Sequence, residues 1–452
     1  MENNITHLYA YQISELLEKK KIDPVILLEQ FIENYEKASN QARYAFCKFL
    51  KKESLLEAES SWKRQKENNR LSIFDGIPTG WKDVIDIKNF PALAGSDLLL
   101  KTRINKIVKD ATVVTRAKKK GIISLAKTST VEFAFGGLGI NSSSPYPPNL
   151  MIKGNYCPGG SSSGSATSVY SSLIPFAVGT DTAGSIRIPS AWHSLVGFKP
   201  TYGSIENHGV LPLSKSFDTL GTISKCVKDT QIFYNILSNR NYKFPNIKPE
   251  KITACVVDDF ITTLLSSKER SIYENLICSL ASKGVKIKRI KVPEFNIINS
   301  ILRKKGGVVN FEAWNYWKNT IKTNMNNIDT NVASRFILGK NISSTQVGEI
   351  KEKITKLKRS VYKRFKKTEI LLMPTVAIRP PKIDQVLQKK NYIYYNNLVL
   401  NNTRVANIFN LCAITMPIKK DYWFSFSLLA QAKEDKRLLC EAKVIECIIN
   451  NY

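Results

Sequence analysis

Two short segments made almost entirely of small residues constrain this chain most. Residues 159–165 read Gly-Gly-Ser-Ser-Ser-Gly-Ser, and residues 179–187 read Gly-Thr-Asp-Thr-Ala-Gly-Ser-Ile-Arg. Small residues let backbone N–H groups approach a ligand closely and adopt unusual dihedral angles. A serine hydroxyl beside free backbone donors supplies a nucleophile and an oxyanion hole, the two parts that acyl transfer needs. The two segments therefore predict loops that carry a reaction site.

A lysine in an apolar setting supplies the base that such a serine requires. Lys82 ends the segment Gly-Ile-Pro-Thr-Gly-Trp-Lys, residues 76–82. Burial lowers the pKa of a lysine, and a neutral amine can accept a proton from a hydroxyl. The competing interpretation is that the serines belong to ordinary turns and that Lys82 is exposed.

Other motifs match part of the first segment. Residues 160–164 fit G-x-S-x-G, the nucleophile elbow of α/β-hydrolases, with Ser162 as the nucleophile. That mechanism needs an acid and then a histidine further along the chain, but His193 and His208 follow the motif too closely. We expect both histidines to be structural or to line a pocket. A P-loop is disfavoured because no Gly-Lys-Ser/Thr ending follows the glycines.

The predicted elements alternate in the manner of an α/β sheet enzyme. Helices are predicted from Asp23-Pro24 onward, where the pair forms an N-cap and a first helical residue, and at residues 52–66, 111–120, 164–172, 268–283 and 345–366. Strands are predicted at residues 77–87, with an exit loop, and at 122–127, 174–178, 252–257, 285–292 and 370–374. No internal repeat or low-complexity linker interrupts them, which favours one compact domain over residues 1–452.

Composition limits the function classes. The net charge of +29 is compatible with a polyanionic partner such as tRNA, but the basic residues are scattered, so solvated lysines are the favoured interpretation. The eight cysteines occur singly, without C-x-x-C pairs, which is typical of reduced thiols in a cytoplasmic protein. No signal peptide or membrane span is visible. No histidine or cysteine cluster predicts a metal.

An ordered series of segments resembles the amidase signature family of serine hydrolases. The series runs through residues 76–83, 127–134, the two serine loops, 197–203 and 213–221. It covers residues 70–225 closely, whereas residues 1–69 (N-terminal helices) and 226–452 (a variable substrate-pocket and C-terminal part) fit more loosely. The resemblance implies an α/β fold, a single large domain in which helices cover both faces of a mixed central β-sheet.

The resemblance also implies a Ser-Ser-Lys triad. Ser185 takes the place of the nucleophile, Ser161 that of a bridging serine preceded by a cis peptide bond, and Lys82 that of the base. A neutral Lys82 would draw a proton from Ser161, which would draw one from Ser185 as Ser185 attacks the amide carbonyl. The relay would then reverse to protonate the leaving amine.

The family's oxyanion hole falls on four consecutive backbone N–H groups: those of Thr182, Ala183, Gly184 and Ser185. Ala183 stands where glycine is common in the family, so we expect its φ to be negative. Asp181 and Arg187 flank this loop and are expected to pair and hold it. Ser162 is expected to act as a supporting donor at the start of the following helix.

The function that follows is hydrolysis of a small carboxamide to a carboxylate and ammonia by a free-standing amidase, with no cofactor and no metal. The alternative is the A (glutaminase) component of a tRNA-dependent amidotransferase, which would bring tRNA and a partner subunit. A catalytically silent scaffold is a second alternative, and a homodimer is compatible with each.

The substrate pocket is expected at residues 135–140, 155–157 and 395–417. Residues 419–426 depart from the family pattern, so the sequence does not name the amide.

Overall fold

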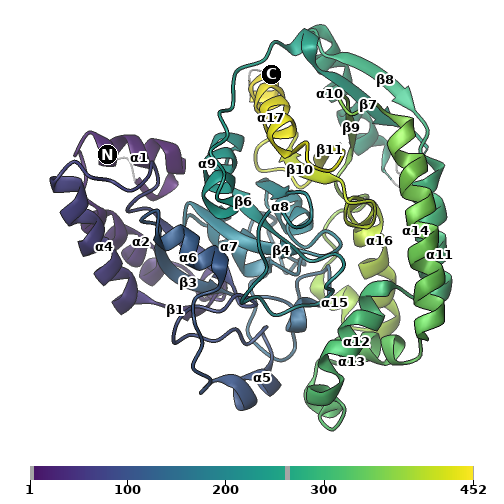
Figure 1. Ribbon diagram of the computed structural model, residues 1–452, viewed down its shortest axis with the longest axis horizontal. Coiled ribbons are helices and arrows are strands. Elements are labelled where there is room, and N and C mark those ends of the chain that lie inside the picture. Colours follow the sequence, from purple (N-terminus) through teal and green to yellow (C-terminus); the bar gives the residue numbers. More distant parts are fainter. Residues whose placement is uncertain (1–4, 260–264, 451–452) are drawn as a thin grey trace.

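The computed structural model describes residues 5–259 and 265–450. Its strands, in chain order, are β1 (Phe46–Phe49), β2 (Pro78–Lys82), β3 (Ile123–Thr128), β4 (Phe176–Asp181), β5 (Val196–Lys199), β6 (Thr219–Ser224), β7 (Thr253–Val257), β8 (Lys286–Ile290), β9 (Ile370–Pro374), β10 (Cys412–Pro417) and β11 (Ser425–Ala430). All belong to one 11-stranded sheet with the order β1-β3-β2-β4-β6-β5-β10-β11-β9-β7-β8 (Figure 1). The predicted α/β class with a mixed sheet is confirmed.

The sheet has a parallel part on each side of an antiparallel middle, and β1 pairs antiparallel with β3 at one edge. β2 runs parallel to β3 and to β4, and β7 runs parallel to β8 and β9. Between them, β4, β6, β5, β10, β11 and β9 pair antiparallel in that order. The strands β2, β3, β4 and β6 are buried at every position, as expected where helices cover both faces.

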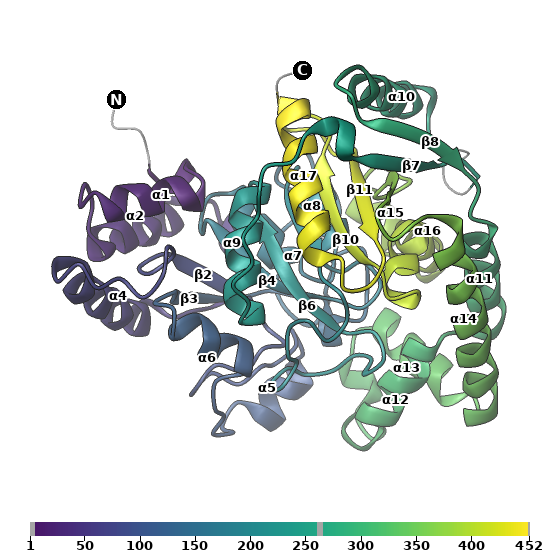
Figure 2. The ribbon, with the colours of Figure 1, turned by 45° about the horizontal axis from the view of Figure 1, so that its top comes forward.

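The helices form two rows on the sheet. One row contains α6 (Thr112–Lys118), α9 (Val227–Ser238), α17 (Asp435–Asn450) and α10 (Ser267–Ser282), each in contact with the next (Figure 2). The other contains α7 (Ser163–Tyr170), α8 (Arg187–Trp192), α16 (Lys389–Ile408), α11 (Pro293–Lys305) and α14 (Ser344–Arg364), likewise in succession. The remaining helices are α1 (Ala10–Glu18), α2 (Pro24–Lys37), α3 (Asn40–Arg43), α4 (Lys51–Lys66), α5 (Asp97–Arg103), α12 (Val308–Ile321), α13 (Thr330–Lys340) and α15 (Ile383–Val386).

Most predicted elements occur within a few residues of their expected bounds. The Asp23 side chain accepts hydrogen bonds from the N–H groups of Val25 and Ile26 at the start of α2, as its N-cap role requires. The strand predicted at 174–178 is shifted, because β4 continues to Asp181. Strands β1, β5, β6, β10 and β11 and the 20-residue helix α16 were not predicted as such.

The parallel part of the sheet brings the two serine loops and the lysine together. Lys82 ends β2, Thr128 ends the adjacent β3, and Thr180 and Asp181 end β4 on the other side. Because these strands are parallel, their carboxyl ends lie at one edge, where α/β enzymes commonly bind ligands. The neighbouring helices α7 and α8 begin directly after the loops that carry Ser161 and Ser185.

Candidate active site

Lys82 is fully buried and donates to two hydroxyl groups. Its Nζ lies 2.7 Å from Ser161 Oγ and 2.8 Å from Thr180 Oγ1. Among the residues that the structure describes, no carboxylate forms an ion pair with it. The sequence-based pairing of Lys82 with Ser161 is thus present in the structure, and the exposed-lysine interpretation is wrong.

The surroundings of Lys82 bring its pKa close to neutral. Burial lowers the pKa of Lys82 from 10.5 to about 7, and the negative charges of Asp218 and Asp181 offset part of that effect. An amine with this pKa is largely neutral above pH 7 and can take a proton from a hydroxyl.

Ser161 is fixed by the segment that follows β3. Its carbonyl oxygen accepts hydrogen bonds from Thr130 Oγ1 at 2.9 Å and from the N–H of Val131 at 3.2 Å. The peptide bond between Gly160 and Ser161 is cis, as the resemblance implies. Hydrogen bonds to the Ser161 carbonyl oxygen therefore fix the backbone of the loop whose hydroxyl contacts Lys82.

Ser185 lies next to this loop. The N–H of Ser162 donates to the carbonyl oxygen of Ser185 at 3.1 Å, which joins the two serine segments. Only 5% of Ser185 is exposed. Within the described residues its hydroxyl makes no direct hydrogen bond to Ser161. Among the three residues of the predicted triad, the hydrogen bond that the described structure contains is the one between Lys82 and Ser161.

A buried ion pair holds the loop after β4. Arg187 donates through Nε and Nη2 to the two carboxylate oxygens of Asp181 at 3.0 and 2.9 Å. Burial by itself raises the pKa of Asp181, but Arg187 outweighs it and lowers this pKa to about 2. Asn407 of α16 donates to the same carboxylate and accepts from Arg187. The predicted pairing of Asp181 with Arg187 is present.

The four expected oxyanion donors are not equivalent. The N–H of Gly184 donates to Asp181 Oδ1 at 2.8 Å, so this donor is already engaged and the expectation for Gly184 is corrected. The N–H groups of Thr182, Ala183 and Ser185 have no hydrogen-bond partner among the described residues. Ala183 is not among the residues with positive φ, as predicted.

A family model described as Amidase matches residues 27–439. The chain belongs to the amidase family. A 2-amino-5-chloromuconic acid deaminase of Comamonas testosteroni is 29% identical over 83% of this chain and 82% of its own length. The A component of a glutamyl-tRNA(Gln) amidotransferase from Sulfurisphaera tokodaii is 26% identical over 98% of both chains. A crystal structure of an amidase superposes with a TM-score of 0.87 at 22% identity, covering 97% of this chain and 99% of the other. This amidase-family protein is a hydrolase that acts on amide C–N bonds.

The competing elbow motif has no support in the contacts of Ser162. Its hydroxyl donates to the carbonyl oxygen of Thr180 at 3.3 Å and is fully buried. His193 is also buried, but it contacts Thr167 and the carbonyl oxygen of Pro189 instead. Ser162 therefore has no described histidine as a general base and sits, as expected, at the start of α7.

Sequence reasoning assigned no individual contact to four residues that lie beside Lys82 or the loop after β4. Thr180, like Ser161, accepts a hydrogen bond from Lys82. Asp218 accepts a 2.6 Å hydrogen bond from the Thr182 hydroxyl. Thr403 and Asn407 reach the loop after β4 from α16. Residues 395–417 were expected to line the substrate pocket, but only the fold shows that this segment contacts the loop after β4.

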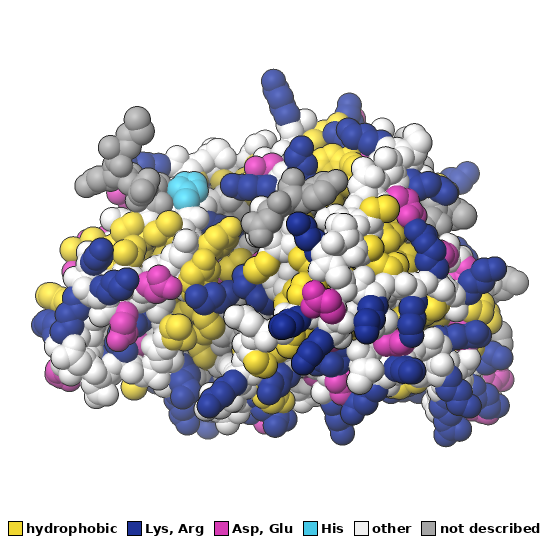
Figure 3. Space-filling model, turned by 90° about the horizontal axis from the view of Figure 1, so that it is seen from above, with side chains coloured by type: hydrophobic (Ala, Val, Ile, Leu, Met, Phe, Trp, Pro, Cys, Tyr) yellow, Lys and Arg dark blue, Asp and Glu magenta, His cyan; other side chains and the backbone are white. Residues whose placement is uncertain are grey.

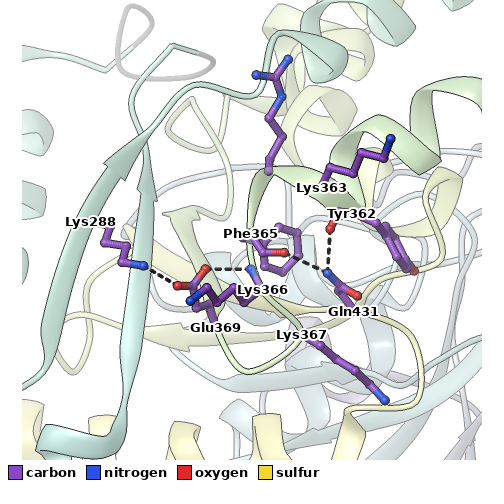
Figure 4. Close-up of a pocket in the computed structure, with 9 residues that line it drawn as sticks. Lys288, Tyr362, Lys363, Phe365, Lys366, Lys367, Glu369 and Gln431 are labelled. Atoms are coloured by element: carbon purple, nitrogen blue, oxygen red, sulfur yellow. Dashed lines mark hydrogen bonds and ion pairs between the residues drawn. The ribbon is translucent and has the colours of Figure 1, made fainter.

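The basic surface is distributed and partly neutralised. Figure 3 shows lysine and arginine side chains spread over one whole face, with acidic side chains among them. An open basic cleft of about 510 Å³ lies beside β8 and the end of α14, away from Lys82, and its Lys288 pairs with Glu369 (Figure 4).

No group of three or more His, Cys, Asp or Glu in the described residues could hold a metal ion. None of the described helices is long and apolar enough to span a membrane.

Proposed function

We propose that this protein hydrolyses a small carboxamide to a carboxylate and ammonia through an acyl-enzyme on Ser185. The observation that carries the proposal is the buried Lys82, which has a pKa of about 7 and lies 2.7 Å from Ser161 Oγ. As Ser185 attacks the substrate, the neutral amine accepts the Ser161 proton while Ser161 accepts that of Ser185. Both serines lie beside the edge formed by the carboxyl ends of β2 and β4.

Attack by Ser185 Oγ on the carbonyl carbon forms a tetrahedral oxyanion. The N–H groups of Thr182, Ala183 and Ser185 supply its hydrogen bonds, and each such donor is worth about 3 kcal/mol to the transition state. The proton stored on Lys82 returns through Ser161 to the amide nitrogen, the C–N bond breaks, and ammonia leaves. Water then repeats the sequence on the acyl-enzyme and releases the acid. We place this activity in the cytoplasm because all eight cysteines are free thiols.

The test uses Ser185→Ala, with Ser162→Ala as the matched control. Ser185→Ala abolishes release of ammonia from primary amides and blocks labelling by a fluorophosphonate probe, whereas Ser162→Ala keeps both. Circular dichroism shows that both variants are folded. Substantial turnover by a folded Ser185→Ala protein contradicts the mechanism, and a label on Ser162 contradicts both the nucleophile and the relay.

A second function, the glutaminase component of a tRNA-dependent amidotransferase, is favoured by one observation. The Sulfurisphaera tokodaii amidotransferase component aligns with this chain over 98% of both lengths. The two functions separate by experiment, since such a component co-purifies with a partner and releases ammonia from glutamine faster when charged tRNA is added. A free-standing amidase turns over without either.

A further inference from the structure

Glu312 of α12 holds the loop that connects β5 with β6. One of its carboxylate oxygens accepts hydrogen bonds from Ser214 Oγ at 2.7 Å and from the N–H of Ser216 at 3.0 Å, and the other accepts from Ser216 Oγ. Lys351 of α14 forms an ion pair with the same carboxylate at 2.9 Å, and only 15% of the Glu312 side chain is exposed. Hydrogen bonds to an ionised acceptor are about twice as strong as neutral ones, so this carboxylate fixes residues 214–216.

The same loop also holds Asp218. The N–H groups of Leu213 and Ser214 donate to one oxygen of Asp218 at 2.8 and 2.9 Å. The other oxygen accepts the Thr182 hydroxyl at 2.6 Å. Ser214 is thus bound through its hydroxyl to Glu312 and through its N–H to Asp218. A continuous series of contacts therefore runs from α12 to Thr182, one of the three residues of the proposed oxyanion hole.

A second contact anchors α12 against this loop. The indole Nε1 of Trp317 donates to the carbonyl oxygen of Pro212 at 3.0 Å. The Trp317 ring meets that of Phe133 edge to face, with 4.9 Å between the ring centres. Phe133 belongs to the segment whose backbone holds the carbonyl oxygen of Ser161. Glu312 therefore extends from a helix that is itself anchored to two segments beside the catalytic loops.

We infer that Glu312 is a positioning residue for the reaction at Ser185. It fixes residues 214–216, these residues fix Asp218, and Asp218 holds Thr182 so that the N–H of Thr182 faces the developing oxyanion. Among the described residues Glu312 makes no hydrogen bond to any member of the triad, so it acts through the loop. This inference rests on the proposed function. It places a determinant of the rate in α12, outside residues 70–225, which carry Lys82 and both serine loops.

The test measures kcat and KM for ammonia release from the best substrate among acetamide, butanamide and benzamide. Glu312→Ala removes all three hydrogen bonds to the loop and lowers kcat by about tenfold or more, up to the ~10²–10³-fold loss of one oxyanion donor. KM stays unchanged, because the Thr182 N–H binds the oxyanion only in the transition state. Glu312→Gln keeps an acceptor oxygen for the loop and therefore keeps more of kcat than Glu312→Ala does.

Two controls separate the loop contact from other effects. Lys351→Met removes the ion pair but leaves the contacts of Glu312 with the loop, and Glu352→Ala removes an exposed glutamate that pairs with Lys356. Both keep kcat within about threefold of the wild type. Melting curves show whether each variant is folded, and Glu312→Gln replaces Glu312→Ala in the comparison if the latter is not. Equal losses of kcat in Lys351→Met and Glu312→Ala overturn the inference, as does a wild-type kcat in folded Glu312→Ala.

The pH profile supplies a readout that a purely structural role leaves unchanged. Burial lowers the pKa of Lys82, and the charges of Asp218 and Asp181 offset part of that effect. When Glu312→Ala releases Asp218, this offset shrinks and the acid limb of kcat/KM moves to lower pH. Glu312 does not cause the limb itself: burial raises its pKa, but Lys351 and the two serines outweigh burial and lower it. An acid limb that stays in place in Glu312→Ala overturns the inference.

A double-mutant cycle tests the route through Thr182. Thr182→Val removes the hydroxyl that Asp218 holds and keeps the backbone N–H. Adding Glu312→Ala to Thr182→Val lowers kcat by less than about threefold, because the series of hydrogen bonds is already broken. Losses of kcat that multiply in the double variant show that the two residues act independently, and they overturn the inference.

Hydrogen exchange keeps the inference apart from the proposed function. Mass spectrometry follows exchange in peptides that cover residues 212–218 and 179–187 of the wild type, Glu312→Ala and Lys351→Met. Faster exchange of both peptides in Glu312→Ala alone supports the connection even if no amide is hydrolysed, in which case only the proposed function fails. Unchanged exchange of residues 179–187 in folded Glu312→Ala, with amides hydrolysed by the wild type, overturns the inference and leaves the proposed function standing.

Discussion

The pH dependence of kcat/KM for a primary amide tests the role of Lys82 quantitatively. An ordinary lysine with a pKa of 10.5 is neutral in only about 1 molecule in 3,000 at pH 7. Burial lowers the pKa of Lys82 to about 7, so about half of the enzyme then holds the neutral amine that can accept a proton. The fold thus increases the active fraction at pH 7 by roughly 10³-fold.

The direction of the pH effect follows from which form is active. Lowering the pH protonates Lys82 and stops the relay, so kcat/KM falls about tenfold per pH unit below 7 and reaches about 1% of its plateau at pH 5. Above pH 8 the profile is flat as far as Lys82 is concerned. The assay measures initial rates of ammonia release from pH 5 to 9, at amide concentrations well below KM.

Asp218 provides the control, because burial raises its pKa to about 6 and it would titrate in the same range. Its negative charge stabilises protonated Lys82, so Asp218→Asn moves the acid limb to lower pH if Lys82 is the base. If Asp218 itself causes the limb, the limb disappears in that variant. A wild-type profile that is flat from pH 5 to 9, or that still rises about tenfold between pH 8 and 9, refutes the assignment of Lys82.

Two further predictions concern residues around the triad. Ser161→Ala removes the relay and lowers kcat by ~10²–10⁴-fold. Ser162→Ala removes one hydrogen bond worth about 1 kcal/mol and lowers kcat by less than about tenfold. Equal losses of kcat in the two variants contradict the distinct roles of the two serines. Arg187→Met leaves Asp181 buried without its cation and lowers the free energy of unfolding by about 3–5 kcal/mol, measured by urea denaturation, and an unchanged midpoint disproves this account of the loop.

Sequence reasoning anticipated the elements that depend on local patterns. Asp23-Pro24 at the start of α2 and the apolar run of β9 are recognisable within a few residues, because capping and burial leave a local trace. The position of β10 and β11 between β5 and β9 was not foreseen. Strand order depends on pairing between segments that are more than 200 residues apart, such as Ile414 with Phe198. A single sequence does not indicate which distant segments pair.

The candidate site likewise contains residues that local motifs predict and contacts that depend on the fold. Lys82, Ser161 and Ser185 could be proposed because they stand in motifs, and Asp181 with Arg187 because they flank one. The hydrogen bond from the Gly184 N–H to Asp181 could not be predicted, because it depends on how the loop turns after β4. The contact of Thr403 with Ala183 joins residues 220 positions apart, so a local motif does not indicate it.

The late position of β10 and β11 bears on how the enzyme is made in the cell. These strands, residues 412–430, lie inside the sheet. They join the six strands β1, β3, β2, β4, β6 and β5 on one side with the three strands β9, β7 and β8 on the other. A ribosome delivers all nine of those strands before it delivers the two that connect them. Until then the edges of β5 and β9 are unpaired, a condition in which nascent chains aggregate or recruit chaperones. Translation pausing or truncation after residue 411 would therefore yield two incomplete sheets, and activity would appear only when the last strands have inserted.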